Sequence, residues 1–432
     1  MVTHQHPDIQ KPNVCEAKRI RLISPILHIG SEVQRLNPFE YVQTSNRVFL
    51  PNPEFLAKAL KQRGYLEDYI TAIENRESIV ELLENAFGNN WKGAKTPNGE
   101  PIFLDGFINR KWPEEQVTDL RPMIRNGMGQ FYIPGSSIKG AIRTAIAYHL
   151  LKHAQQYQVH QAHRVSAIEQ TLRQKLQGNG LSKYNQKRLD DQLFEKSLFC
   201  DFDLTYQGKA IRAKLGPNTD FMRAIHVSDS QPLVEHKVAN KQGKEIPYNI
   251  PVVAEVIVSS HFPGYKAKYR ASIYAEMVRK VRTEFTLSLD TEMLSWFSHK
   301  QGMKLPFQSV DDILSICQEF AQGQWDFEHD YWDDIKTNPK AMDRNLDFSQ
   351  IREIYEPETC PYQLRLGWGS GMRGTTVNLL LPDDLVANIR DVCGISAPGF
   401  EAPKSRRTVV GPRGDIKYVP GWVKFKELNK EC

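Results

Sequence analysis

The chain has 432 residues, a hydrophobic content of 40% and a formal net charge of +5, with a mean hydropathy of −0.49. This length allows two or three domains, since a single hydrophobic core rarely grows beyond roughly 250–300 residues. No apolar run approaches the roughly 20 residues that span a bilayer, and the N-terminal segment lacks the apolar core of a secretory signal. We therefore expect a cytoplasmic protein without a membrane anchor.

The six cysteines occur singly, without a C-x-x-C pair, so neither a zinc ribbon nor a disulfide framework is predicted. The charge is distributed unevenly. From Lys404 to the C-terminus, eight Lys or Arg residues stand against three acids, whereas residues 305–335 hold eight acids and no Lys or Arg. A polyanion would be attracted to the first segment and repelled by the second. We expect the acidic stretch to lack basic neighbours and to face solvent or a basic partner protein.

The first half of the chain alternates short strands with helices. Residues 20–30 are rich in Ile and Leu and end at a glycine, which predicts an opening strand. Residues 53–87 have helical periodicity in more than one segment. An apolar aromatic run at 131–134 predicts a strand that turns directly into a helix, and a polar helical run follows over about 150–198.

The second half begins with strands and adds helices later. Alternating or β-branched segments predict strands at 223–230, 252–260, 269–278 and 282–290. Helical patterns follow near 291–300 and 309–322. The chain then has a glycine-rich loop, a helix or strand to about residue 391, a Pro/Gly-rich loop over 396–413 and a last strand near 417–428. Strands separated by helices predict an α+β protein.

The sharpest motif is "IPGSSIKGAIR" at 133–143, where the predicted strand becomes a helix. A helix N-terminus presents unpaired N–H groups and the positive end of the helix dipole, and glycine lets that backbone approach an anion. Hydroxyls can donate to phosphate, and basic residues four apart lie on one face. The candidates for binding phosphate here are Gly135, Ser136, Ser137, Lys139 and Arg143. An ordinary Gly-Ser N-cap with solvated basic residues explains the pattern equally well.

The second motif is "GWGSGMRG" at 367–374. Its G-x-G-x-x-G spacing matches a dinucleotide-binding fingerprint, but only 58 residues follow it, too few for the remaining units of a Rossmann sheet. A nucleic-acid backbone could lie along this loop, and a flexible hairpin is the alternative. The RNA-binding candidates here are Gly367, Gly369, Gly371, Met372, Arg373 and Gly374.

Four histidines between residues 149 and 163 include a pair, His149 and His153, with the spacing of one helical turn. Such a pair can bind a metal, but no Glu lies inside it as in H-E-x-x-H, and exposed histidines are common on helices. We therefore expect no metal site and no cofactor. Asp229 follows a strand, and we expect it to cap a helix or form a turn.

Together these residues resemble the RAMP proteins of type III CRISPR effector complexes. The resemblance rests on "SPILHIGS", "IPGSSIKGAIR", "LGWGSGMRG" and "PGWVKF", at 24–31, 133–143, 366–374 and 420–425. Their order and the last feature resemble the fifth subunit of the Csm series, which caps the type III-A complex at the 3′ end of the guide RNA. One departure is Pro420, where the pattern has an apolar residue before Gly-Trp.

The resemblance implies two ferredoxin-like, RRM-related RAMP domains with helical insertions. We expect the first at 1–235 and the second, with the acidic helical insertion and the basic C-terminal segment, at 236–432. It also implies a guide-RNA-binding and assembly subunit that aids guide-RNA maturation without catalysing it. The implied partners are guide RNA, neighbouring RAMP backbone subunits, small helical subunits and a host nuclease. His28, in the opening motif, joins the RNA-binding candidates.

Two other functions remain open from the sequence. A RAMP-type endoribonuclease needs general acid and base groups at the scissile phosphate, and its candidates are His28, His226 and Lys139. A nucleotide-dependent enzyme would use the loop at Gly369. Copurified RNA of guide length favours RNA binding or RNA processing, and a bound nucleotide favours the third function. No spacing brings catalytic groups together, so we expect no RNA cleavage by the isolated protein.

Overall fold

The fold is organised around one large mixed β-sheet. The computed structural model describes residues 15–104, 108–177, 191–240, 242–393 and 396–428. Within these residues the main path through the sheet is β16 (Leu364–Arg365), β19 (Trp422–Glu427), β1 (Cys15–Leu27), β12 (Ala267–Asp290), β11 (Ile250–His261), β4 (Ile108–Lys111), β3 (Arg47–Phe49) and β2 (Val42–Gln43). Off this path, β5 (Leu120–Arg121) and β8 (Ile225–Val227) pair with β12, β17 (Arg406–Val410) pairs with β11, and β18 (Ile416–Tyr418) pairs with β17.

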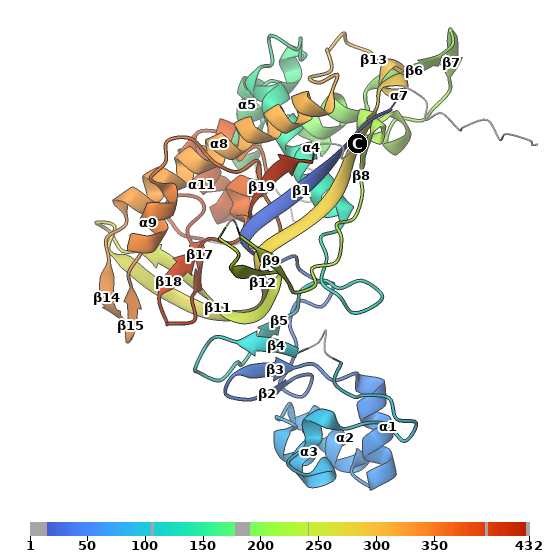
Figure 1. Cartoon of the computed structure of the whole chain (residues 1–432). Coiled ribbons are helices and arrows are strands. Elements are labelled where there is room, and N and C mark those ends of the chain that lie inside the picture. The colour runs from blue at the N-terminus through green and yellow to red at the C-terminus, as the bar shows by residue number, and fades with distance from the viewer. Residues whose placement is uncertain (1–14, 105–107, 178–190, 241, 394–395, 429–432) are drawn as a thin grey trace, which may run out of the picture.

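Strands β1 and β12 form the centre of the sheet, where Figure 1 shows them as two long arrows side by side. They pair antiparallel from Cys15 opposite Asp290 to Leu27 opposite Val278. The apolar side chains of β12 join different hydrophobic clusters along the strand. Its later apolar residues, such as Phe285, belong to the main core, whereas earlier ones join a separate cluster on another face. Lys280, which lies between the main-core residues Val278 and Val281, has a φ of +51°.

Two long helices cover one face of the sheet. α4 (Gly135–Lys152) and α8 (Val310–Asp334) share the main core with β1 and β12 through side chains such as Ile142 and Phe320. α8 begins with a capping box, in which the Ser309 hydroxyl accepts from the N–H of Asp312 and the Asp312 carboxylate accepts from the N–H of Ser309. These two bonds satisfy N–H groups that a helix start leaves unpaired. The second half of α8 packs against α9 (Ser349–Tyr355) in a further core.

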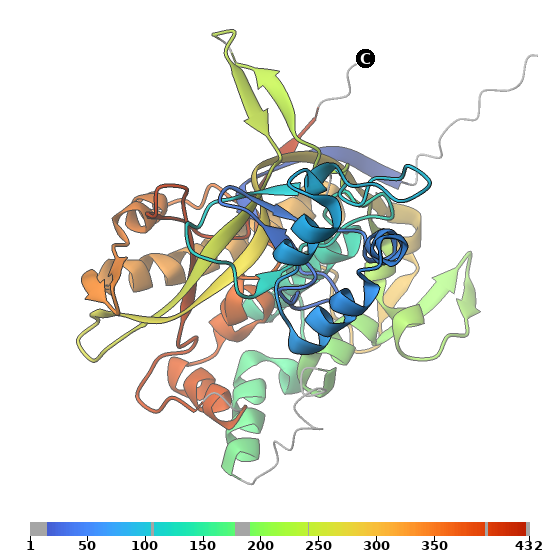
Figure 2. The ribbon, with the colours of Figure 1, turned by 90° about the horizontal axis from the view of Figure 1, so that it is seen from below.

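A helical lobe lies beyond the edge formed by β2, β3 and β4. α1 (Pro53–Arg63), α2 (Leu66–Asn75) and α3 (Val80–Phe87) enclose a core of their own. Figure 1 shows the three helices grouped together and apart from α8, and Figure 2 shows the same group from below, in front of the sheet. α1 starts at Asn52, whose side chain accepts from two N–H groups of the first turn. The prediction of several helical segments in this region is confirmed.

The remaining elements are short. They include the strands β6 (Phe202–Tyr206), β7 (Lys209–Ile211) and β13 (Phe297–His299), and the hairpins of β9 (His236–Ala239) with β10 (Glu245–Tyr248) and of β14 (Asn338–Ala341) with β15 (Arg344–Leu346). The other described α-helices are α5 (Val165–Gln177), α7 (Thr291–Ser295), α10 (Gly371–Thr375) and α11 (Asp383–Val392), and a π-helix spans Asp191–Cys200. Short 3-10 helices also occur among the described residues. None of the described helices combines the length and the apolar character that crossing a bilayer requires.

The structure corrects four predictions of secondary structure. The helix predicted near 291–300 covers only α7, because residues 297–299 form β13, which pairs with β6. Residues 269–278 and 282–290 form one strand, β12, because its pairing with β1 continues past Lys280. The strand predicted before α4 is reduced to an isolated bridge at Phe131, since the chain turns into the helix almost at once. The loop predicted over 396–413 contains β17, which pairs with β11.

The mixed α/β architecture is confirmed. β1, from the first predicted domain, pairs with β12 and β19 from the second, so both segments contribute to one sheet. The division after residue 235 and the ferredoxin-like character of each part stay predictions. Of the helical run predicted over about 150–198, residues 178–190 lie outside the described part, and the described part holds α5 and the π-helix.

Candidate nucleic-acid interface

Three of the four sequence motifs meet at the end of β1. The N–H of Trp368 donates to the carbonyl oxygen of His28 at 3.0 Å, which joins the glycine loop to the opening strand. The N–H of Leu366 donates to the carbonyl oxygen of Gly421 at 2.7 Å, and Gly421 donates to Ile26 at 3.3 Å. The opening strand, the glycine loop and the closing strand therefore form one hydrogen-bonded unit.

Two glycines of the loop are required by close packing. A Cβ on Gly367 would lie 2.2 Å from the carbonyl oxygen of His28, and one on Gly369 would lie 2.7 Å from Cγ of Pro420. A Cβ on Gly371 would meet nothing within 4 Å, although all three residues have positive φ. Pro420, which departs from the pattern of the family that the sequence resembles, fits here because its ring packs into the space that Gly369 leaves.

Cationic and aromatic side chains gather beside this unit. The guanidinium carbon of Arg121 lies 5.1 Å from the Trp368 ring centroid, and that of Arg407 lies 4.9 Å from it. The guanidinium carbon of Arg279 lies 5.8 Å from the Trp112 ring centroid. Trp112 in turn stacks on a tyrosine, with 6.2 Å between centroids. We name this set the arginine–aromatic surface, and its members are Arg121, Arg279, Arg407, Trp112, Trp368 and Tyr418.

Strand alternation brings these side chains to one face. Ala275, Met277 and Arg279 alternate along β12, as do Arg407 and Val409 along β17. Ala275, Met277 and Val409 belong to one buried cluster. The three aromatic rings of the arginine–aromatic surface pack against this cluster. Among the described residues, no helix contributes a side chain to this cluster. Here aromatic rings and guanidinium groups cover the sheet in place of a helix.

Among the described residues, no carboxylate pairs with the arginines of this surface. Their side chains instead contact the rings of Trp368 and Trp112. Nε of Arg407 is buried without a hydrogen-bond partner. Burial lowers the pKa of Arg407, and the charges of Arg121 and Arg365 lower it further. Because an anion relieves the repulsion between uncompensated cations, this surface is suited to bind phosphate.

His28 lies beneath the surface as a buried histidine. Its Nδ1 donates to the carbonyl oxygen of Glu276 at 2.6 Å, and its ring meets Trp368 edge-on. Burial lowers the pKa of His28 to about 4, although the hydrogen bond to Glu276 opposes the shift. Only 2% of the residue is exposed, so this side chain contacts Trp368 and barely reaches solvent.

A buried carboxylate fixes the segment that carries Arg121. Glu276 is fully buried and accepts from both terminal nitrogens of Arg125, at 2.7 and 2.8 Å, and from the N–H of Met123 at 2.9 Å. A buried charge requires such partners. Because β5 also pairs with β12 at Ala275, Arg121 is held at a defined place beside Trp368. No sequence pattern indicates this pairing.

The N-terminus of α4 lies elsewhere, against β8. A Cβ on Gly135 would lie 2.3 Å from the carbonyl oxygen of Val227. The N–H of Gly135 donates to the Asp229 carboxylate at 2.7 Å, so the capping role predicted for Asp229 is confirmed. Ser136 is exposed and Ser137 is half-buried. The Asp229 carboxylate thus accepts the hydrogen bond that the N–H of Gly135 would otherwise donate to a phosphate.

The basic residues of the α4 motif are engaged within the protein. Nζ of Lys139 donates to the carbonyl oxygen of Ile225 at 2.7 Å, and burial lowers the pKa of Lys139. Arg143 forms ion pairs with Glu195 and Asp220, each at 2.7 Å. The phosphate contacts of these residues stay predictions, and in this structure their polar atoms face protein groups.

The end of the glycine motif lies on α10. Arg373 is buried and donates to the carbonyl oxygens of Asn378 at 2.7 Å and Ala402 at 3.2 Å, and it pairs with Asp383. A Cβ on Gly374 would lie 3.0 Å from a side-chain oxygen of α8, and Met372 is half-buried. The RNA contacts of these residues stay predictions. In the structure, Arg373 connects the segments that carry Asn378, Asp383 and Ala402.

The expectation about the acidic stretch is corrected, and the endoribonuclease alternative loses support. The acidic stretch does have basic neighbours, which come from distant segments and form the pairs Asp311–Lys18, Glu319–Lys152 and Glu328–Arg406. The proposed catalytic histidines do not converge. His28 bonds to Glu276, whereas His226 pairs with Ser288, twelve positions further along β12.

Comparison with protein families shows that the model of the RAMP superfamily matches residues 19–332. Among curated proteins, the CRISPR system protein Csm5 of Enterococcus italicus is 27% identical over 146 residues. These residues are 30% of this chain and 41% of that protein, so the match spans less than half of the relative's length.

Two solved structures share the fold. A chain of the Csm–crRNA–target RNA ternary complex of a type III-A CRISPR–Cas system, solved by cryo-EM, has a TM-score of 0.61 and 23% identity, with 95% of this chain and 100% of that chain covered. The crystal structure of T. onnurineus Csm5 has a TM-score of 0.52 and 19% identity, with 94% and 100% covered.

Proposed function

The chain belongs to the RAMP superfamily, and we propose that it is the Csm5-type subunit of a type III-A CRISPR ribonucleoprotein. In this role it binds the guide RNA, caps one end of the assembly and aids guide-RNA maturation without cutting RNA itself. It works in the cytoplasm beside RAMP backbone subunits and small helical subunits, with a host nuclease recruited for maturation. The sequence similarity to Csm5 and the shared fold with a chain of a Csm–crRNA–target RNA complex support this proposal.

The observation that carries RNA binding is the arginine–aromatic surface. Guanidinium groups without carboxylate partners attract phosphates, and aromatic rings stack on bases of any sequence. RRM domains likewise use aromatic side chains on a sheet face to stack the bases of single-stranded RNA. RNA would neutralise charges that the protein leaves uncompensated at Arg121 and Arg407. Binding then depends on the RNA backbone more than on base sequence.

Salt dependence tests these interactions with phosphate. The full-length chain is titrated with two single-stranded RNAs of unrelated sequence over a range of salt concentrations. Arg121→Gln and Arg407→Gln each remove one cation that neutralises a phosphate, so each should lower the slope of log K against log salt by about 0.7, equally for both RNAs. Arg173→Gln is the control, since Arg173 is a partly exposed arginine paired with Glu169 and Asp384. An unchanged slope in the double variant Arg121→Gln/Arg407→Gln, or a change in sequence preference alone, contradicts the proposal.

Cleavage assays test the RAMP-type endoribonuclease alternative. Labelled guide precursor is incubated with the protein, with and without Mg²⁺ or Mn²⁺, beside the double variant His28→Ala/His226→Ala. No cleavage is expected, because the described positions of the two histidines do not bring an acid and a base to one phosphate. Cleavage by the wild type that the double variant lacks would favour the endoribonuclease.

A nucleotide-dependent activity has little support. The loop at Gly369 leads into α10, a helix of 5 residues, whereas a dinucleotide fingerprint opens a long helix of a βαβ unit. The Pro420 ring already packs on Gly369.

A further inference from the structure

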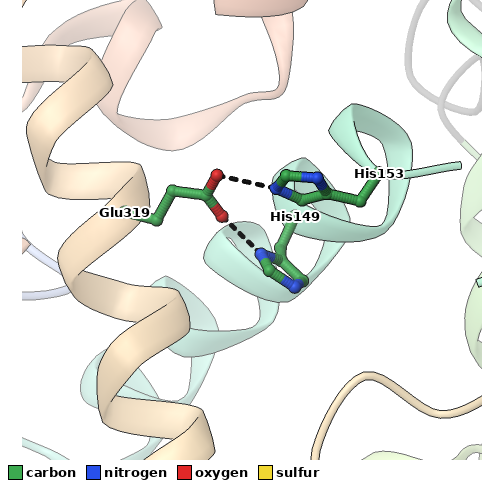
Figure 3. A group of neighbouring side chains, drawn as sticks. All are labelled: His149, His153 and Glu319. Atoms are coloured by element: carbon green, nitrogen blue, oxygen red, sulfur yellow. Dashed lines mark hydrogen bonds and ion pairs between the residues drawn. The ribbon is translucent and has the colours of Figure 1, made fainter. Parts of the chain in front are cut away.

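We propose that His149, His153 and Glu319 form a zinc-binding site that joins α4 to α8 (Figure 3). The two histidines lie one turn apart near the end of α4, and Glu319 reaches them from the middle of α8. Nε2 of His153 lies 2.8 Å from one carboxylate oxygen of Glu319, and Nδ1 of His149 contacts the other. One ligand atom from each residue lies within 4.8 Å of the other two.

The donor set suits zinc. Two imidazoles and one carboxylate bind Zn²⁺ well, whereas Mg²⁺ and Ca²⁺ prefer oxygen ligands alone. In a tetrahedral site with bonds of about 2.0–2.1 Å, ligand atoms stand about 3.3–3.5 Å apart. The present contacts of Glu319 would open slightly to admit the ion. A water molecule would take the fourth position.

A neighbouring hydroxyl orients the more buried histidine. Nε2 of His149 is hydrogen-bonded to the Tyr157 hydroxyl at 2.9 Å, which leaves Nδ1 directed at Glu319. Histidines that bind metals usually have their other ring nitrogen fixed in this way. The side chains of His149, His153 and Glu319 are 16%, 34% and 24% exposed. The ligands are therefore partly ordered by packing and still reachable by an ion from solvent.

Lys152 is the competitor for this site. Its Nζ lies 2.9 Å from Glu319, so an ammonium group and two imidazoles surround the carboxylate in the metal-free chain. The Lys152 side chain is 42% exposed, so it can turn into solvent when zinc takes its place.

The site was not predicted from the sequence because its third ligand is distant. His153 and Glu319 are 166 residues apart, and the pair of histidines alone lacked a carboxylate at a recognisable spacing. Only the packing of α4 on α8 brings the three side chains together. Zinc bound there would add a link between the two helices that cover the sheet.

Zinc titration of the full-length chain tests the proposal. Protein treated with a chelator is titrated calorimetrically with zinc chloride, and one saturable equivalent per chain is expected. His153→Gln and Glu319→Gln should each weaken binding at least about tenfold, since each removes one ligand. Lys152→Gln should strengthen binding, because the competing charge is gone. His160→Gln/His163→Gln removes another histidine pair, whose ring nitrogens bond to the main chain, and should leave the affinity unchanged.

Cobalt spectroscopy and melting supply independent readouts. Co²⁺ in place of zinc should give the visible bands of a four-coordinate ion without thiolate charge-transfer bands, which excludes a cysteine site. Zinc should raise the melting temperature of the wild type and of Lys152→Gln, but not that of His153→Gln, because a ligand that binds only the folded state stabilises it. Absence of saturable binding, or wild-type affinity in both His153→Gln and Glu319→Gln, would overturn the proposal.

Discussion

Trp368 meets the His28 imidazole edge-on, with 5.4 Å between the ring centroids and 74° between the ring planes. This contact joins the glycine loop to the end of β1 and places the indole within reach of Arg121 and Arg407. Segments far apart in the sequence thus contribute one ring and two cations to a single surface. The opening motif and the glycine motif depend on each other, because each shapes the backbone on which the other packs.

Trp368→Ala should weaken RNA binding without unfolding the protein. Removing the stacking of one base costs about 1–3 kcal/mol, which is roughly 5- to 150-fold in affinity, and the effect should be similar for RNAs of unrelated sequence. Fluorescence anisotropy with labelled single-stranded RNA measures it. Trp296→Ala is the control, since Trp296 packs against Tyr206 and no guanidinium lies over it among the described residues. Equal weakening in both variants would contradict the assignment.

Gly367→Ala should destabilise the protein more than Gly371→Ala. The φ angles of these glycines are +75° and +73°, so both substitutions introduce left-handed strain of about 1–2 kcal/mol. Only at Gly367 does the new Cβ overlap main chain, 2.2 Å from the carbonyl oxygen of His28. Denaturant titrations give the two free energies of unfolding. If these fall by the same amount, the packing of the loop on β1 does not require glycine.

The stability of the protein should depend on pH through His28. Burial lowers its pKa to about 4 in the folded protein, whereas an unfolded histidine titrates near 6.5. Between these values the unfolded chain binds a proton that the folded chain does not, so the free energy of unfolding rises with pH. The effect is absent above pH 6.5 and reaches about 3 kcal/mol of lost stability below pH 4.

His28→Gln tests this dependence, since glutamine keeps a donor for the carbonyl oxygen of Glu276. Urea titrations at pH 5 and pH 7.5 should show a smaller difference in the variant than in the wild type. An identical pH dependence in both proteins would show that His28 does not cause it.

Local elements could be predicted from the sequence because neighbouring residues specify them. Helical periodicity indicated α1, α2, α3 and α8, and the Pro-Gly-Ser-Ser turn indicated the start of α4. Lys280 marks the limit of this reasoning. The sequence pattern predicts two separate strands on either side of this residue. In the structure, however, the pairing of β12 with β1 continues past it.

The candidate site was predicted only in part. The opening and glycine motifs indicated the loop and the strand beneath it, but Arg121 and Arg407 belong to no motif. Their place depends on β5 and β17 pairing with the central strands, which no local pattern encodes. The sequence shows the charges of Lys139 and Arg373 but not the carbonyl oxygen and the carboxylate that these side chains contact within the protein. Their RNA contacts stay predictions.

Mapping where guide RNA touches this chain in the assembled complex is the sharpest test of the proposed interface. The complex is purified with its RNA, cross-linked with ultraviolet light, digested and measured by mass spectrometry, and the bound RNA is sequenced. We predict RNA of guide length and cross-links in the peptides that carry Trp368 and Tyr418. Absence of guide RNA, or cross-links confined to other faces such as the lobe of α1, α2 and α3, would contradict the arginine–aromatic surface as the site of RNA binding.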